Sequence, residues 1–196
     1  MARRSRDQAE QTRARIVMEA TSLFRDQGYA ATSIDEICAR SGITKGALFH
    51  HFKNKKALFL EIWTSLQMQM DAAAREAGIA NVDKDDPYHA FLAGCRVYLE
   101  WTVRPDYQKI VLFDGPSVLG LETWHQLDYS LGLRNMQTGV GYLAKRGLIS
   151  QDRVEAVAIL LQGALNGVGF ALRRTPPPIT LDEAHAAFEA LVRAIR

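Results

Sequence analysis

Apolar side chains recur along most of the chain at the three- and four-residue spacing of an α-helix. Between residues 11 and 27 they occupy one helical face, namely Ile16, Val17, Ala20, Leu23 and Phe24. Similar patterns predict further helices at 34–40, 45–51, 55–77, 87–103, 105–113, 121–145, 153–173 and 181–195. No segment shows the two-residue alternation of a half-buried strand. We therefore expect an all-α fold of about nine helices.

Two short helices near the N-terminus are joined by a tight turn. Ser33 and Glu36 have the spacing of a capping box, which starts a helix, and Thr44 caps the next helix. Gly42 lies between them and can adopt the left-handed conformation that a sharp turn needs. This arrangement is typical of a helix-turn-helix, over about residues 32–51.

Polar segments divide the rest of the chain. A long helix begins after the polar segment 53–56 and ends at Gly78, and a polar linker follows at 81–87. We predict an N-terminal three-helix domain over 1–54, a connecting helix over 55–78, and a helical C-terminal domain over 87–196.

Charge is unevenly distributed along the chain. The 196 residues carry a formal net charge of only +2. Residues 1–60 hold 11 Lys and Arg against 6 Asp and Glu, a net charge of +5, and the remainder of the chain is at −3. A basic N-terminal segment followed by an acidic remainder favours a polyanionic partner for the N-terminal segment. A chance fluctuation of charge on a solvated surface would give the same net charges.

Composition narrows the class of protein. A content of 47% hydrophobic and 23% charged residues is typical of a globular protein. The two cysteines, Cys38 and Cys95, provide no disulfide framework, and we expect both to be buried thiols. The N-terminus is polar and no apolar run approaches the ~18 residues that span a bilayer. We therefore expect a cytoplasmic protein without a membrane partner. No His or Cys pair has metal-ligand spacing, so we expect neither a metal nor a cofactor.

The second helix of a helix-turn-helix enters the major groove of DNA. Lys45 lies at its exposed start, where a cation and backbone N–H groups can approach a phosphate or a guanine. Gly46 leaves room for close approach. Phe49 can touch a thymine methyl group, although a single Phe is more often part of a core. The residues that can contact DNA from this helix and the next are Lys45, Gly46, Phe49, His50, His51 and Lys55.

The segments 28–37 and 41–55 resemble the DNA-binding domain of the TetR family of transcriptional regulators, and the likeness extends over about residues 9–69. The resemblance implies an all-α homodimer that usually represses transcription from a palindromic operator. It also implies that a small molecule in the C-terminal domain, here unidentified, releases the protein from DNA. By the same resemblance, helices at about 153–173 and 181–195 pair across the dimer two-fold.

Residue by residue, the resemblance implies DNA contacts from the second short helix and its flanks. It also implies a phosphate contact from Ser33 or its neighbour Thr32. Phe49 stands where the family very often has Tyr, and His50 stands where an aromatic residue is usual, so the phenolic contact to phosphate is absent. The positions carried over in the second helix and its flanks are Thr44, Lys45, Gly46, Phe49, His50, His51 and Lys55.

The C-terminal domain is rich in aromatic residues, some of which can line a hydrophobic pocket although most such residues form the core. Trp101, Phe113 and Trp124 are our candidates, because they flank the short helix and turn in the middle of the domain. A signal from such a pocket to DNA would require a contact between the helix at 55–77 and the short helix after Pro105.

Two other classes of function compete with DNA binding. A helical adaptor that binds protein would have the same fold. A small all-α enzyme would need a nucleophile with a base or paired carboxylates, and the acids and histidines after residue 60 form no such motif. We therefore expect a ligand-responsive regulator rather than an enzyme, and an activator remains an alternative to a repressor.

Overall fold

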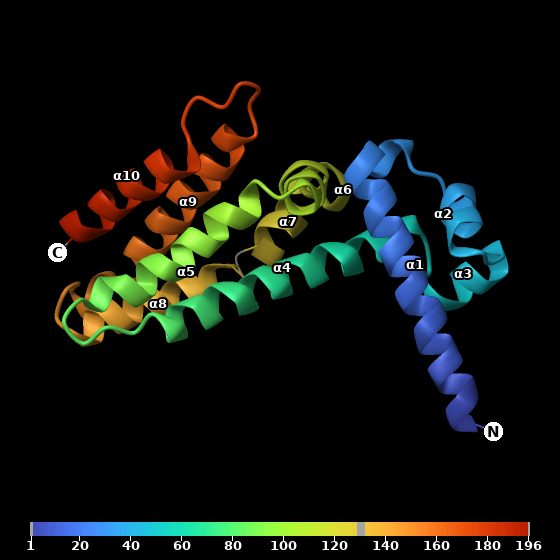
Figure 1. The fold of residues 1–196 in the computed structure, drawn as a ribbon, viewed down its shortest axis with the longest axis horizontal. Helices are drawn as coiled ribbons and strands as arrows, with labels where there is room; N and C mark the ends of the chain where they lie inside the picture. The colour runs from blue at the N-terminus through green and yellow to red at the C-terminus, as the bar shows by residue number, and fades with distance from the viewer. Residues whose placement is uncertain (1, 129–131, 196) are drawn as a thin grey trace. The chain divides into compact units, whose positions relative to one another are not determined.

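The computed structural model describes residues 2–128 and 132–195, in which every regular element is helical (Figure 1). The predicted all-α fold is confirmed, with ten α-helices in these two ranges. Their bounds are α1 Ala2–Ala31, α2 Ile34–Ser41, α3 Lys45–His51, α4 Lys55–Ala80, α5 Pro87–Thr102, α6 Gly115–Leu119, α7 Leu121–Asp128, α8 Arg134–Lys145, α9 Val154–Leu172 and α10 Leu181–Ala194.

Two elements differ from the expected helices. The segment expected as an ordinary helix at 105–113 is a π-helix, η1 (Tyr107–Asp114), and α6 follows it where a turn was predicted. In the described parts of the region 121–145 lie α7 and α8, and residues 129–131 of this predicted helix lie outside the described residues. A short 3₁₀ turn, η3 (Gln151–Arg153), precedes α9. A π-helix has backbone hydrogen bonds between residues five apart instead of four. Over one short segment this barely changes the spacing of apolar residues, so the sequence pattern does not distinguish it from an α-helix.

The turns and caps of the helix-turn-helix are formed largely as the sequence predicts. Gly42 ends α2 with a φ of 64°, in the left-handed region. Ser33 accepts a hydrogen bond from the backbone N–H of Glu36, and Thr44 accepts one from Ala47. The reciprocal half of the capping box at Ser33 is not seen, because the Glu36 carboxylate accepts from the Gln27 side chain.

The chain divides into two compact units. The first comprises residues 1–66 with 105–120, and the second comprises 67–104 with 121–196. The segment 105–120 was expected to belong to the C-terminal domain, but η1 packs against α1 in the first unit. Helix α4 contributes its first part to one unit and its remainder to the other.

The core of the first unit is built on an aromatic cluster. Phe24, Tyr29 and Phe59 have ring centroids 5.1–5.7 Å apart. Around it lie fully buried apolar side chains from α1, α2, α3 and α4, including Ile16, Ala20, Ile37, Leu48, Leu58 and Trp63.

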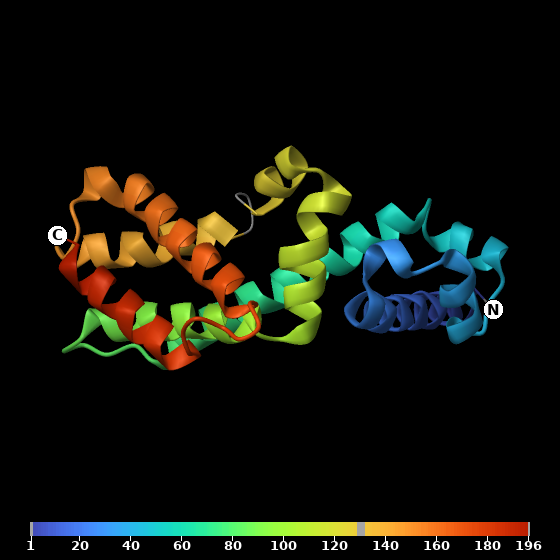
Figure 2. The same cartoon turned by 90° about the horizontal axis from the view of Figure 1, so that it is seen from above.

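The second unit is a helical bundle in which α9 packs against α5, α8 and α10 (Figures 1 and 2). Its centre is apolar and includes Leu99, Val140, Leu143, Leu161 and Val192. Two ion pairs tie α10 to the start and middle of α5: Arg193 to Asp86 at 2.6 Å and Arg96 to Asp182 at 2.8 Å.

Candidate nucleic-acid interface and ligand cavity

Helix α3 has a buried face and an exposed face. Leu48 is fully buried in the first unit. Phe49, the next residue, is 48% exposed, and Lys45 and His50 are also exposed. A large apolar side chain in water is unfavourable unless a partner covers it. The structure therefore presents Phe49 with polar and cationic neighbours on one outward surface, and does not place it in the core.

The start of α3 is open to approach from outside. Gly46 is exposed, and a Cβ added there would come no closer than 3.9 Å to the nearest heavy atom counted, Thr44 Oγ1. The missing side chain is therefore not needed for packing within the protein. Thr44 and Ser33 are exposed as well, and each hydroxyl uses a lone pair to cap its own helix, leaving its O–H able to donate to a phosphate.

Lys45 forms an ion pair with Asp35 on α2, with Nζ and Oδ1 2.6 Å apart. The pKa of Lys45 is raised by its hydrogen bond to this carboxylate and by the nearby charge. Both side chains are exposed, so the pair contributes little to folding. A phosphate approaching Lys45 competes with Asp35 for the same ammonium group.

The two histidines of α3 differ in environment. His50 is exposed, whereas His51 is half-buried with its ring centroid 5.4 Å from that of His50. Burial lowers the pKa of His51, and the neighbouring His50 and Arg13 lower it further. His51 is therefore neutral near pH 7 in this structure, and it can donate a single N–H.

Two residues predicted to contact phosphate, Thr32 and Lys55, have their polar groups engaged at the end of α1 in this structure. Thr32 is 1% exposed, and its hydroxyl donates to the carbonyl of Gly28 at 2.8 Å. Lys55 Nζ donates to the carbonyls of Tyr29 and Thr32 at 2.9 and 2.7 Å, and it lies 4.2 Å from the centroid of the Tyr29 ring. Burial lowers the pKa of Lys55. The last carbonyls of a helix have no hydrogen-bond donor within the helix, and the Lys55 ammonium group is such a donor here.

A polar contact that the sequence did not predict holds η1 against α1. Asp114 is buried, and its carboxylate accepts from the backbone N–H of Tyr29 at 2.8 Å and from Lys109 Nζ at 2.9 Å. Gly28 has a φ of 85°, and a Cβ there would lie 2.6 Å from Lys109 Nζ. The Lys109 ammonium lies at the end of a flexible side chain and could move aside, so it is the positive φ of Gly28 that requires glycine at this position.

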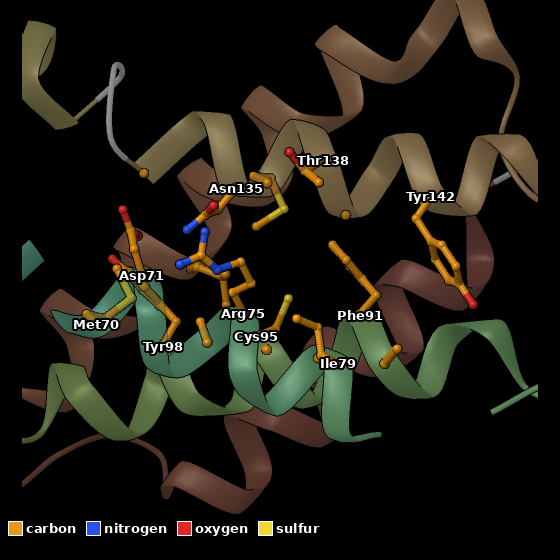
Figure 3. Close-up of a pocket in the computed structure, with 18 of the residues that line it drawn as sticks. Met70, Asp71, Arg75, Ile79, Phe91, Cys95, Tyr98, Asn135, Thr138 and Tyr142 are labelled. Atoms are coloured by element: carbon orange, nitrogen blue, oxygen red, sulfur yellow. The ribbon is translucent and has the colours of Figure 1, made fainter. Parts of the chain in front are cut away.

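The second unit contains a cavity of about 290 Å³ between α4, α5, α8 and α9 (Figure 3). Most of its wall is apolar. Polar side chains in its lining are Asp71 and Arg75 on α4, Tyr98 on α5, and Asn135 on α8. Thr138 also lines it, but its hydroxyl donates to the carbonyl of Arg134 at 2.9 Å within α8. Its apolar lining includes Met70, Ile79, Phe91, Met136 and Leu165.

Trp101, Phe113 and Trp124, the aromatic residues predicted to line a pocket, are not among the described lining of this cavity. Trp101 is stacked by the guanidinium of Arg104, 3.8 Å from its ring centroid. Phe113 belongs to the first unit and is 46% exposed, while Trp124 is buried in the second unit. Aromatic content and central position do not specify which way a helical side chain points, and the cavity is instead built from the end of α4 and small residues of α5 and α8.

The described residues contain no group of three or more His, Cys, Asp or Glu side chains that could hold a metal ion. One helical stretch, 151–172, is long and apolar enough to cross a membrane by length and composition alone, although no such stretch was expected from the sequence. Core helices of soluble proteins pass the same criterion, and α9 packs within the bundle.

Two family models match the chain. Residues 16–62 match the one described as bacterial regulatory proteins, tetR family. Residues 88–195 match the one described as tetracyclin repressor-like, C-terminal domain. The first match contains the helix-turn-helix, and the second covers more than half of the chain.

Relatives and solved structures agree with these matches. The chain is 46% identical over 63 residues to the HTH-type transcriptional regulator AcrR of Shigella flexneri, covering 32% of this chain and 29% of AcrR. It is 28% identical over 153 residues to the transposon Tn10 TetC protein of Escherichia coli, covering 78% of this chain and 73% of TetC. A putative transcriptional regulator from Pseudomonas aeruginosa PAO1 shares the fold, with a TM-score of 0.76, 20% identity, and coverage of 93% and 89%.

The matched segment thus spans less than a third of AcrR and nearly three quarters of TetC. The helix-turn-helix with an exposed α3, the helical second unit and the two family models together identify the chain: it belongs to the TetR family of bacterial transcriptional regulators.

Proposed function

We propose that the protein is a homodimeric repressor whose two α3 helices bind a palindromic operator. The observation that carries this proposal is the two-sided character of α3. Leu48 anchors the helix in the core, while Phe49 is half exposed beside Lys45 and His50. Those outward side chains are suited to the major groove, where an apolar group can meet a thymine methyl and a cation can meet guanine or phosphate.

The distribution of charge supports binding to the DNA backbone. Residues 1–60 carry a net charge of +5, so a dimer brings two such segments to the duplex. Ser33 and Thr44 sit at the N-termini of α2 and α3, where free backbone N–H groups favour an anion. Two recognition helices that enter successive major grooves lie about 34–36 Å apart.

The surface of α9 supports dimerisation. Leu160 is 70% exposed and Phe170 is 41% exposed. Between them, Gly163 and Gly167 are exposed, and a Cβ at either would meet nothing within 4 Å. These four positions follow one helical face, which we call the α9 stripe. An apolar stripe with glycines at its centre allows a partner helix to approach closely, and Leu191 of α10 adds a further exposed apolar side chain.

The cavity of the second unit is the proposed site for the effector that releases DNA. Helix α4 runs from the DNA-binding unit into the cavity wall, with Lys55 at its start and Arg75 near its end. In the first unit, Trp63 of α4 donates its indole N–H to the carbonyl of Val111 in η1 at 3.4 Å. A change in α4 on ligand binding would therefore be felt where η1 packs against it.

DNase footprinting on the DNA upstream of the protein's own gene tests this proposal. We expect protection of two inverted half-sites about one helical turn apart. Deletion of the gene should raise expression from that promoter. Protection of a single unpaired site, or expression that falls on deletion, would contradict the dimeric repressor.

A further inference from the structure

We propose that the cavity accepts a compact organic monoanion, with its carboxylate at Arg75 and its apolar body in the interior of the second unit. This inference rests on the proposed function, because it takes the cavity to be the effector site. It goes further by naming the chemical class of the ligand and the residue that recognises its charge.

The size and lining of the cavity define the body of the ligand. A volume of about 290 Å³ lies at the lower end of the range of small-molecule sites, roughly 300–1,000 Å³. Met70, Phe91 and Met136 line it together with other apolar side chains. Methionine and aromatic side chains adapt well to flat or irregular apolar surfaces. A small aromatic or branched apolar body therefore fits the interior.

Arg75 is the cation of the described lining; the residue is exposed, and its guanidinium has no ion pair or hydrogen bond with a residue that the structure describes. Its guanidinium points from α4 toward α8, in the direction of Asn135 (Figure 3). The planar guanidinium fork matches a carboxylate with two parallel hydrogen bonds. The amide of Asn135 lies beside the same space as a further hydrogen-bonding group.

Asp71 limits the negative charge that a ligand in the cavity can carry. It lies one turn before Arg75 on α4 and is half-buried in the same lining. Its carboxylate repels a second negative charge on the ligand and is the group that would attract a cation instead. Burial raises the pKa of Cys95, so its thiol stays neutral and adds no charge. A single negative charge at the Arg75 end is the best match to these groups.

Isothermal titration of the full-length protein with three probes of one shape tests the proposal. The probes are 2-naphthoate, 2-naphthalenemethanol and 2-naphthylmethylamine, which carry a carboxylate, a neutral hydroxyl and an ammonium on the same body. We expect the carboxylate to bind at least about tenfold more tightly than the alcohol, and the ammonium to bind most weakly. The variant Arg75→Met should remove the preference for the carboxylate and leave the affinity for the alcohol unchanged. Arg75→Lys should restore part of the preference.

Three results would overturn the proposal: equal affinity for the three probes, tightest binding of the amine with its loss in Asp71→Asn, or no binding of any probe. DNA binding measured on the same preparations separates this failure from that of the proposed function. Suppose that the wild type and Arg75→Met bind promoter DNA equally, and that the wild type shows no preference for the carboxylate probe. The proposed class of ligand is then wrong, while the proposed function as a DNA-binding regulator is unaffected. If the wild type binds no promoter DNA, the proposed function fails instead.

Discussion

The carboxylate of Asp114 accepts a hydrogen bond from the backbone N–H of Tyr29, at 2.8 Å across 85 residues of sequence. Tyr29 lies directly after Gly28, where α1 changes direction, and Asp114 closes the π-helix η1. Lys109 neutralises the buried carboxylate at 2.9 Å. A single acidic side chain thus joins the end of the first helix of the DNA-binding unit to a segment from the second half of the chain.

We predict that Asp114→Asn lowers the free energy of unfolding by about 1–3 kcal/mol, since it removes a buried charge-assisted hydrogen bond and leaves Lys109 without its partner. Thermal and denaturant unfolding measure the change. Asp83→Asn, in the exposed linker, is the matched control and should have little effect. Equal stability of both variants and the wild type would show that the contact with Tyr29 contributes nothing.

Adjacent residues on α3 should separate folding from DNA binding. Leu48→Ala removes a fully buried side chain and should cost about 2–5 kcal/mol of stability. Phe49→Ala removes a half-exposed one and should leave the melting temperature nearly unchanged while weakening operator binding about tenfold. Fluorescence anisotropy with promoter DNA, together with thermal unfolding, tests both. Unchanged affinity in Phe49→Ala would remove Phe49 from the interface.

Operator affinity should rise as the pH falls from about 8 to about 6. In the free protein burial holds the pKa of His51 below its usual value, with help from His50 and Arg13. A nearby DNA phosphate stabilises the protonated ring, so binding takes up a proton in the interval between the lowered free value and the higher bound value. Binding measured across this range at constant ionic strength should show a smaller pH dependence in His51→Gln. The same slope in both proteins would exclude His51 as a phosphate contact.

The same lowered pKa affects folding in a defined direction. The unfolded chain binds a proton at His51 more readily than the folded protein. This residue's contribution to stability is therefore complete above its unfolded value, near pH 6.5, and declines as the pH falls through it. Binding must accordingly be measured where unfolding experiments show that both proteins remain folded.

The α9 stripe should determine the oligomeric state. Leu160→Ser places a polar group at a position that is 70% exposed in one protomer, so it should leave helix stability nearly intact and weaken the dimer. Sedimentation equilibrium should detect at least about a tenfold rise in the dissociation constant. Met18→Ser, at a 59% exposed position on α1, is the matched control. A dimer that is unaffected by the change at Leu160 would place the interface elsewhere.

The apolar periodicity predicts the helices well, because each buries one face. The face marked by Ile16, Ala20 and Leu23 is buried as expected, and Gly42 takes the left-handed turn. Periodicity cannot show which helices pack together over long distances in sequence. The membership of 105–120 in the first unit depends on the contact of Asp114 with Tyr29, which no local pattern encodes.

The sequence could not show which candidate side chains also bind the protein's own backbone. Lys55, predicted to bind phosphate, donates to carbonyls at the end of α1, and the Thr32 hydroxyl donates to the carbonyl of Gly28. The cavity was sought among aromatic residues, whereas its shape depends on small ones. A Cβ at Gly94 would lie 3.0 Å from the carbonyl oxygen of Ala74, so glycine lets α4 and α5 approach closely beside the cavity. Glycines within the predicted helices were the sequence feature that could have indicated where α4 and α5 pack closely beside the cavity.

We propose that the outward face of α3 binds operator DNA through phosphate and base contacts. The most direct test is the salt dependence of promoter binding, compared between the wild type, Lys45→Ala and Lys55→Gln. We predict that log K falls linearly with log salt concentration for the wild type and that Lys45→Ala lowers the magnitude of this slope by about one. Lys55→Gln should keep the slope and lose stability instead, since Lys55 caps α1. Wild-type binding that is insensitive to salt, or a slope unchanged in Lys45→Ala, would contradict this account of α3.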